Sequence, residues 1–280
     1  MSPPVAESYF GAVDRSRAGL AASKIGRGFL RLILVARDLG AFFLITLSVI
    51  ITKSNVASKM MHPMMRREMT RAGVRLLPMA AFMALGIGFL VIGQSVALLT
   101  RVGAQELTGK IMVAVVIREL GPAVTALLML SKIGTATVIE LGTARAMGEI
   151  EALEALGIDP VHYLVAPRVC GMALSTFALT VYSILLSLAG GYLFAFLQNV
   201  PLTPEVYLSQ IANALRWSDF ILLALKTAVF GGVISMTCCY EGLARPLTLG
   251  EVSEATTRAV MQSVVLCVVF DGIFLIQTLV

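Results

Sequence analysis

The chain has 280 residues, of which 58% are hydrophobic and only 14% charged, and its mean hydropathy is +0.87. A water-soluble domain has about 45–50% apolar and about 25% charged residues, so this composition excludes a soluble protein and makes lipid the solvent of most of the chain. The net charge of +5 comes from residues 1–75, which hold twelve of the 22 lysines and arginines but four of the 17 acids. Beside membrane spans, such a basic segment predicts a cytoplasmic N-terminus and no nucleic-acid-binding surface.

Residues 1–75 are predicted to form this cytoplasmic N-terminus together with a helix in the membrane interface. Residues 39–51 are continuously apolar, but thirteen residues are fewer than the ~20 that a spanning helix needs. Upstream, charged residues recur at helical spacing on one face, and they are Lys24, Arg27, Arg31 and Asp38. This pattern is typical of an interfacial helix that dips into the bilayer. The basic, methionine-rich segment 53–75 is expected at the cytoplasmic surface, where its cations face anionic lipid.

Five apolar segments follow, and each is long enough to cross a bilayer as a helix. They are residues 76–99, 111–139, 169–197, 219–240 and 256–280. An odd number of spans after a cytoplasmic N-terminus places the C-terminus outside. The connections 140–168 and 241–255 are then cytoplasmic, and 100–110 and 198–218 are external. The predicted fold is all-α: a polytopic membrane protein with an N-terminal interfacial (elbow) helix and one five-span domain over residues 76–280.

The sequence lacks the motifs of the common ATP-binding and hydrolytic sites. Its nearest approach to a phosphate-binding loop, residues 103–111, has five residues between the glycines, and Ile111 replaces the Ser or Thr that binds Mg²⁺. The histidines, His62 and His162, stand alone at predicted surfaces. We therefore predict no catalytic residue, metal ligand or cofactor in this chain. If ATP drives the system, a separate partner subunit binds ATP and Mg²⁺ and hydrolyses the nucleotide.

A short acidic, amphipathic helix is predicted over residues 144–157, between the second and third spans. Its apolar residues recur every third position, with acids interleaved. The apolar row is Met147, Ile150, Leu153 and Leu156, and the acids are Glu149, Glu151 and Glu154. Gly157 and Pro160 mark the end of the helix. On the cytoplasmic side, such a helix is either a solvated connector or a segment that docks in a groove of a soluble partner.

Charged residues inside the spans are costly, at about 2.5–3.5 kcal/mol each. Arg118 and Glu119 are neighbours in the second span and point about 100° apart on a helix, so each needs another partner. The outer half of the fourth span contains Asp219 and Lys226, and the fifth span contains Asp271. At ~1.5 Å per residue, Arg118 and Asp271 lie at matching depths. Asp271 is the predicted partner of Arg118, in a structural ion pair or at the border of a substrate cavity.

Residues 117–169 resemble the characteristic segment of the MlaE-type permeases, which are the membrane subunits of lipid-transporting ABC systems linked to MCE proteins. The segment is IRELGPAVTALLMLSKIGTATVIELGTARAMGEIEALEALGIDPVHYLVAPRV. The resemblance implies a permease homodimer in the bacterial inner membrane, cytoplasmic ATPase subunits and a periplasmic MCE ring. It also implies a lipid-binding cavity at the dimer interface, open toward the periplasm. The family's charged residues fall on Arg118, Glu119 and Asp271, and its coupling helix on residues 144–157.

This resemblance predicts a permease subunit that moves phospholipid or a related lipid between the inner membrane and an MCE protein. The alternative is an ion- or proton-coupled secondary transporter with Arg118, Glu119 and Asp271 as its relay. Such a transporter needs no ATPase and typically has inverted repeats, which the sequence does not show. A membrane scaffold without transport is the third interpretation. The family often has Arg where this chain has Lys132, which keeps the charge without the planar fork, so the role of Lys132 stays open.

Overall fold

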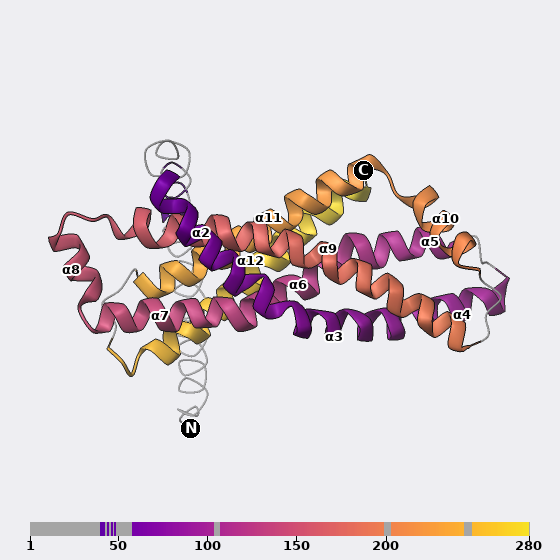
Figure 1. Cartoon of the computed structure of the whole chain (residues 1–280), viewed down its shortest axis with the longest axis horizontal. Coiled ribbons are helices and arrows are strands. Elements are labelled where there is room, and N and C mark those ends of the chain that lie inside the picture. The colour runs from indigo at the N-terminus through magenta and orange to yellow at the C-terminus, as the bar shows by residue number, and fades with distance from the viewer. Residues whose placement is uncertain are drawn as a thin grey trace, which may run out of the picture. The chain divides into compact units, whose positions relative to one another are not determined.

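The computed structural model describes residues 40–42, 44, 46, 48, 58–103, 107–198, 203–243 and 248–279. The predicted interfacial helix around residues 24–38 lies outside these residues, so it and the domain boundary at residue 75 remain predictions. By its internal contacts the chain divides into residues 1–47 and residues 48–280. Every helix labelled in Figure 1 lies in the second unit.

All regular secondary structure of the described residues is helical, and five helical segments are long and apolar enough to cross a membrane. They are Pro63–Val102, Thr108–Ala146, Val161–Leu197, Trp217–Leu243 and Val252–Gln277. Each of them overlaps one of the five predicted spans, so the all-α, five-span fold is confirmed. At most ends the helices run beyond the predicted limits, because hydropathy marks only the apolar part of a helix.

Several of these segments are built from more than one helical stretch. The first contains α2 (Ser58–Ala72), η1 (Val74–Leu76), α3 (Leu77–Ile87), η2 (Gly88–Ile92) and α4 (Gly93–Val102). The second contains α5 (Thr108–Met112), η4 (Val113–Leu120), α6 (Gly121–Met129), η5 (Leu130–Gly134) and α7 (Thr135–Ala146). The remaining elements are α8 (Glu149–Ala155), η6 (Val161–Val165), α9 (Ala166–Leu197), α10 (Pro204–Ala214), α11 (Trp217–Leu243) and α12 (Val252–Leu279). The stretches η2, η4, η5 and η6 are π-helical.

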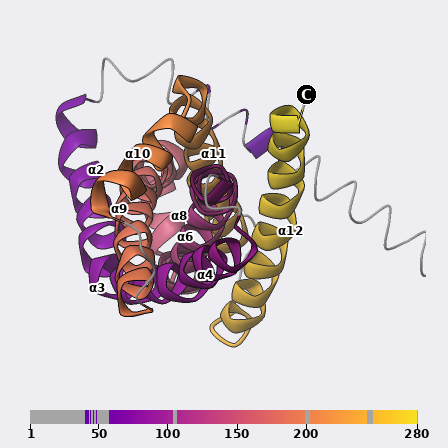
Figure 2. The ribbon, with the colours of Figure 1, turned by 90° about the vertical axis from the view of Figure 1, so that its right-hand side faces the viewer.

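Helix α9 is central to the packing, since α2 and α3 lie along it and α11 packs against it. Glycines allow the close approach: a Cβ on Gly231 of α11 would lie 2.7 Å from the Cα of Ala173 in α9. Small residues at such crossings are how helices in lipid gain packing energy. Helix α12 contacts α11 and α7, and it lies on the opposite side of the helices from α2 and α3 (Figure 2).

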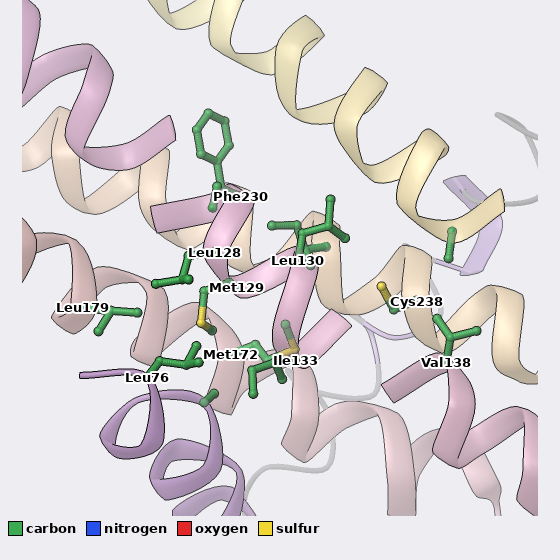
Figure 3. Packing of buried hydrophobic residues seen from close by; sticks show 14 of the residues in the cluster. Leu76, Leu128, Met129, Leu130, Ile133, Val138, Met172, Leu179, Phe230 and Cys238 are labelled. Carbon is green, nitrogen blue, oxygen red and sulfur yellow. The ribbon is translucent and has the colours of Figure 1, made fainter. Parts of the chain in front are cut away.

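Two apolar clusters fill the interior at different levels along the helices. One includes Phe230 and Ile234 of α11 together with residues of α3, α6 and α9 (Figure 3). The other includes Leu223 of α11 with Val116 and Ile117 of η4. Along α11, the buried Lys226 therefore lies between the two clusters. This alternation places a polar layer between two apolar ones.

The connections between spans gather at two ends of the helices, which we call the α8 end and the α10 end (Figure 1). Helix α8 lies at the first, and α5 and α10 lie side by side at the second. Helix α10 was not predicted. Its start carries an N-terminal signal, because Thr203 accepts a hydrogen bond from the backbone N–H of Val206 and Pro204 occupies the first helical turn.

Candidate functional site

Pro122, just after the charged residues Arg118 and Glu119 of the second span, leaves one backbone carbonyl without its usual helical donor. Proline has no backbone N–H, so Pro122 cannot donate to the carbonyl of Arg118, four residues earlier. The Lys226 ammonium supplies a donor instead, with its Nζ 3.0 Å from that carbonyl oxygen. The segment η4, which carries Arg118 and Glu119, is π-helical up to Leu120. Such interruptions in helices are frequent at functional sites.

Ion pairs then join η4, α11 and α12. Nζ of Lys226 lies 2.8 Å from Oε2 of Glu119 and 2.6 Å from Oδ1 of Asp271. Nη2 of Arg118 lies 2.8 Å from Oδ1 of Asp219. The second carboxylate oxygen of Asp219 accepts a hydrogen bond of 2.9 Å from the backbone N–H of Arg216, which fixes the start of α11. We call Arg118, Glu119, Asp219, Lys226 and Asp271 the polar layer.

The predicted pairing of Arg118 with Asp271 is wrong. Depth along the membrane normal placed the two at one level, but it says nothing about the direction in which each helix points its side chains. Asp219 lies in the first turn of α11, on the side of Arg118, and Lys226 occupies the space before Asp271. The ion-pair partners that this prediction missed are Asp219 and Lys226, and the signal for them was their charge inside an apolar span.

The polar layer has a buried side and an exposed side. The side chains of Asp219 and Lys226 are 2% and 6% exposed, whereas those of Arg118, Glu119 and Asp271 are 30%, 29% and 33% exposed. Two cations face three carboxylates, so the layer carries a formal excess of one negative charge. Charged groups that stay accessible within a membrane span usually face a water-filled cavity, a partner or a substrate.

An apolar hollow of about 100 Å³ adjoins the exposed side at Asp271. It lies between α6, α11 and α12, and its lining includes Leu127, Leu130, Phe230, Ile234, Val264 and Val268. A charged group at the edge of an apolar groove is complementary to an amphiphile, whose polar head and apolar chain need different surroundings.

The segment predicted as one helix over 144–157 consists of two pieces. Residues up to Ala146 belong to α7, a turn follows at Met147 and Gly148, and α8 covers only Glu149–Ala155. Gly148 has a φ of 77°, a left-handed conformation that favours glycine. The predicted helix start at residue 144 is therefore wrong, because residue 144 belongs to α7 and the turn at Gly148 separates α7 from α8.

The predicted apolar row is likewise divided. Ile150 is 1% exposed and packs inside its own chain, so it is not available to a partner, contrary to the prediction. Met147 and Leu156 are 66% and 75% exposed, and Leu153 is half-buried. The acids Glu149, Glu151 and Glu154 are exposed. Nε of Arg145 lies 3.4 Å from Glu151, which ties α8 to the end of α7.

A second charged group, near the α8 end, was missed by the sequence analysis. Arg168 of α9 is 6% exposed, and its guanidinium lies 2.6 Å from Glu140 of α7 and 3.4 Å from Glu68 of α2. Glu140 also accepts a hydrogen bond from Arg71 of α2. These contacts hold α2, α7 and α9 together. Residues from three separate segments take part, so spacing in the sequence alone carries little signal for them.

Comparison with known proteins identifies relatives over most of the chain. The family described as Permease MlaE matches residues 65–276. The chain is 27% identical to a probable ABC transporter permease protein of Rickettsia felis over 89% of this chain and 93% of that protein. It is 29% identical to the intermembrane phospholipid transport system permease protein MlaE of Haemophilus influenzae over 72% of this chain and 77% of that protein. It is 28% identical to the chloroplastic protein TRIGALACTOSYLDIACYLGLYCEROL 1 of Arabidopsis thaliana over 71% and 57%, respectively.

Proposed function

The chain belongs to the MlaE permease family, and from this premise we propose that it is the permease subunit of an ABC transporter that moves phospholipid or a related lipid. The observation that carries the proposal is the polar layer, in which Arg118, Glu119 and Asp271 are partly exposed and Asp271 lines an apolar hollow. Headgroup and acyl chain would each find matching surroundings there. The name of the Haemophilus influenzae relative, a phospholipid transport permease, supports this substrate class.

Arg118 is the residue of the layer best suited to a lipid phosphate. One terminal nitrogen is paired with Asp219, and the Arg118 side chain is still 30% exposed. A guanidinium offers five donors in a planar fork that matches phosphate oxygens. Asp219 would thus orient the fork while other donors remain for the substrate. Glu119 and Asp271 are held by Lys226, so that they do not repel the phosphate as free acids would.

The energy for transport would come from a separate ABC ATPase on the cytoplasmic side, which binds ATP and Mg²⁺. We place its docking surface on α8 and the turns beside it, where Met147 and Leu156 are exposed among Glu149 and Glu154. Apolar anchors on a helix are a common means of docking in a partner groove. The remaining parts of the proposal are a second permease copy, a periplasmic MCE protein, the bacterial inner membrane, a cytoplasmic N-terminus and an external C-terminus.

Purification from the native organism tests this assignment. The tagged chain is extracted in mild detergent with its native neighbours, and the co-purifying proteins are identified by mass spectrometry. We expect an ABC ATPase and a single-span MCE protein in stable ratio to the chain. A chain that purifies without any ATPase and moves its substrate along an ion gradient in liposomes would contradict the proposal and favour the secondary transporter.

A further inference from the structure

A basic hollow lies where α2 and η1 pass Glu140 in the middle of α7, away from the polar layer. It has a volume of about 520 Å³ and is lined by Arg67, Thr70, Arg71, Arg75 and Glu140. Arg67 and Arg71 stand four residues apart on one face of α2, and Arg75 of η1 lines the same hollow. Three guanidinium groups face one carboxylate, which leaves the lining with an excess of two positive charges.

The arginines of the hollow have different roles. Arg71 donates to one oxygen of Glu140, and Arg168 donates to the other at 2.6 Å. The charge of Glu140 is therefore offset by two cations and does not repel an incoming anion. Arg67 and Arg75 are exposed and have no ion-pair partner among the described residues. Arg67 lies in α2 and Arg75 in η1 beyond the turn at Gly73, and both line the same hollow.

A second hollow shares part of this lining and is partly apolar. It has a volume of about 740 Å³ and is lined by Pro63, Met65 and Met69 together with Arg66, Arg67 and Thr70. Methionine side chains are flexible and fill irregular apolar contacts. A soluble phosphate would use only the basic hollow, whereas a phospholipid would use both: its phosphate on the arginines and its first methylene groups on the methionines.

We propose that the two hollows form a binding site for one anionic phospholipid of the leaflet at the α8 end, with its phosphate between Arg67 and Arg75. In the orientation proposed above, this is the cytoplasmic leaflet, where anionic lipids attract basic segments. The site is separate from the polar layer, and the lipid in it is a resident of the leaflet that helps to hold α2 beside α7 and α9. This resident lipid site does not depend on whether lipid is the transported substrate.

Native mass spectrometry of the full chain in detergent, titrated with phosphatidylglycerol, tests the proposal. The double variant R67Q/R75Q is compared with R101Q/K110Q, which removes two exposed cations near the α10 end. We expect the first variant to bind its tightest phosphatidylglycerol roughly thirtyfold more weakly, and the control to bind it like the unaltered chain. Phosphatidylcholine, which has no net charge, should bind more weakly than phosphatidylglycerol to the unaltered chain.

Two further measurements distinguish this lipid site from a site for soluble phosphate and from the polar layer. Glycerol 3-phosphate should not displace the lipid at equal concentration, because it lacks the chains that contact the methionines, and full displacement would overturn a lipid site. The variant R118Q should bind phosphatidylglycerol as tightly as the unaltered chain does, even if its transport is impaired. Equal affinity of R67Q/R75Q and R101Q/K110Q for phosphatidylglycerol would overturn the proposal. If R67Q/R75Q does not fold, the single variants replace it, each expected to bind several-fold more weakly.

Discussion

Lys226 holds together three parts of the chain that are far apart in sequence. Its ammonium contacts the Arg118 carbonyl, Glu119 and Asp271, and its side chain is only 6% exposed. Such partners offset the cost of burying a lysine, because each interaction replaces part of the water that the ammonium has lost. Removing it leaves two carboxylates without a cation and one carbonyl without a donor.

Replacing Lys226 with Met is therefore expected to destabilise the fold by about 3 kcal/mol, the lower end for breaking a buried pair, since both acids are partly exposed. The measurement is the melting temperature of the purified chain in detergent. Lys110→Met is the control, because Lys110 is exposed near the α10 end. K226M/D271N should recover part of the loss. Equal melting temperatures for K226M and K110M would show that the ammonium does not hold the layer.

At the level of single residues, the sequence identified the charged residues of the spans but not how they pair. Arg118, Glu119 and Asp271 were recognised because charge in an apolar span is conspicuous. Their partners depend on the rotation of each helix about its axis, which neither depth nor hydropathy reveals. The same limit explains Ile150, which fits the apolar row by spacing but is turned into its own chain.

Helices α9 and α11 come close together at the adjacent glycines Gly231 and Gly232, of which only Gly231 is at the contact. A Cβ on Gly231 would lie 2.7 Å from the Cα of Ala173 and 2.9 Å from the Met172 carbonyl oxygen, whereas a Cβ on Gly232 would meet nothing within 4 Å. Substitution of either glycine by alanine changes helix propensity, but only substitution of Gly231 also disturbs the contact between α9 and α11.

Gly231→Ala should force the backbones of α9 and α11 apart and destabilise the protein by about 2 kcal/mol. Gly232→Ala should be neutral or stabilise it by up to about 1 kcal/mol, because Ala favours a helix more than Gly does. Both values come from unfolding in mixed micelles under increasing denaturant. A G231A variant as stable as G232A would mean that the α9–α11 contact is looser than described.

Helix α8 presents a narrower surface to a partner than the sequence suggested. We expect Met147→Asp combined with Leu156→Asp to leave the fold intact, since both side chains are exposed, and to reduce co-purifying ATPase by about tenfold. Leu249→Asp is the matched control, because Leu249 is 66% exposed on another connection. If the ATPase is retained by M147D/L156D, the acids of α8 form only a solvated face.

The helices themselves were predictable, but their interruptions were not. Long apolar segments determine spans through local hydropathy, so all five were found. Gly148 looked like part of a continuous amphipathic helix because its left-handed φ of 77° depends on the turn that leads into α8. Helix α10 was not predicted, although Thr203 and Pro204 are residue types typical of a helix start.

For the whole molecule, two surfaces at different places serve different parts of the proposed cycle. The polar layer and its apolar hollow lie among η4, α6, α11 and α12, while the proposed ATPase-docking surface lies on α8. The second span connects them, because it carries Arg118 in η4 and leads directly into α8 through α7. Movement of α8 by a partner therefore acts on the same helical segment that lines the proposed lipid path.

The central claim is that ATP hydrolysis by a partner drives lipid movement past Arg118. The direct measurement is transfer of a labelled phospholipid between proteoliposomes that contain the complete complex and its MCE protein, with and without ATP. We predict ATP-dependent transfer that falls about tenfold or more in Arg118→Ala, with the ATPase still bound, and that is unchanged in Arg101→Ala, an exposed arginine of α4. Lipid transfer that is independent of ATP, or that R118A leaves at the level of R101A, would contradict the account.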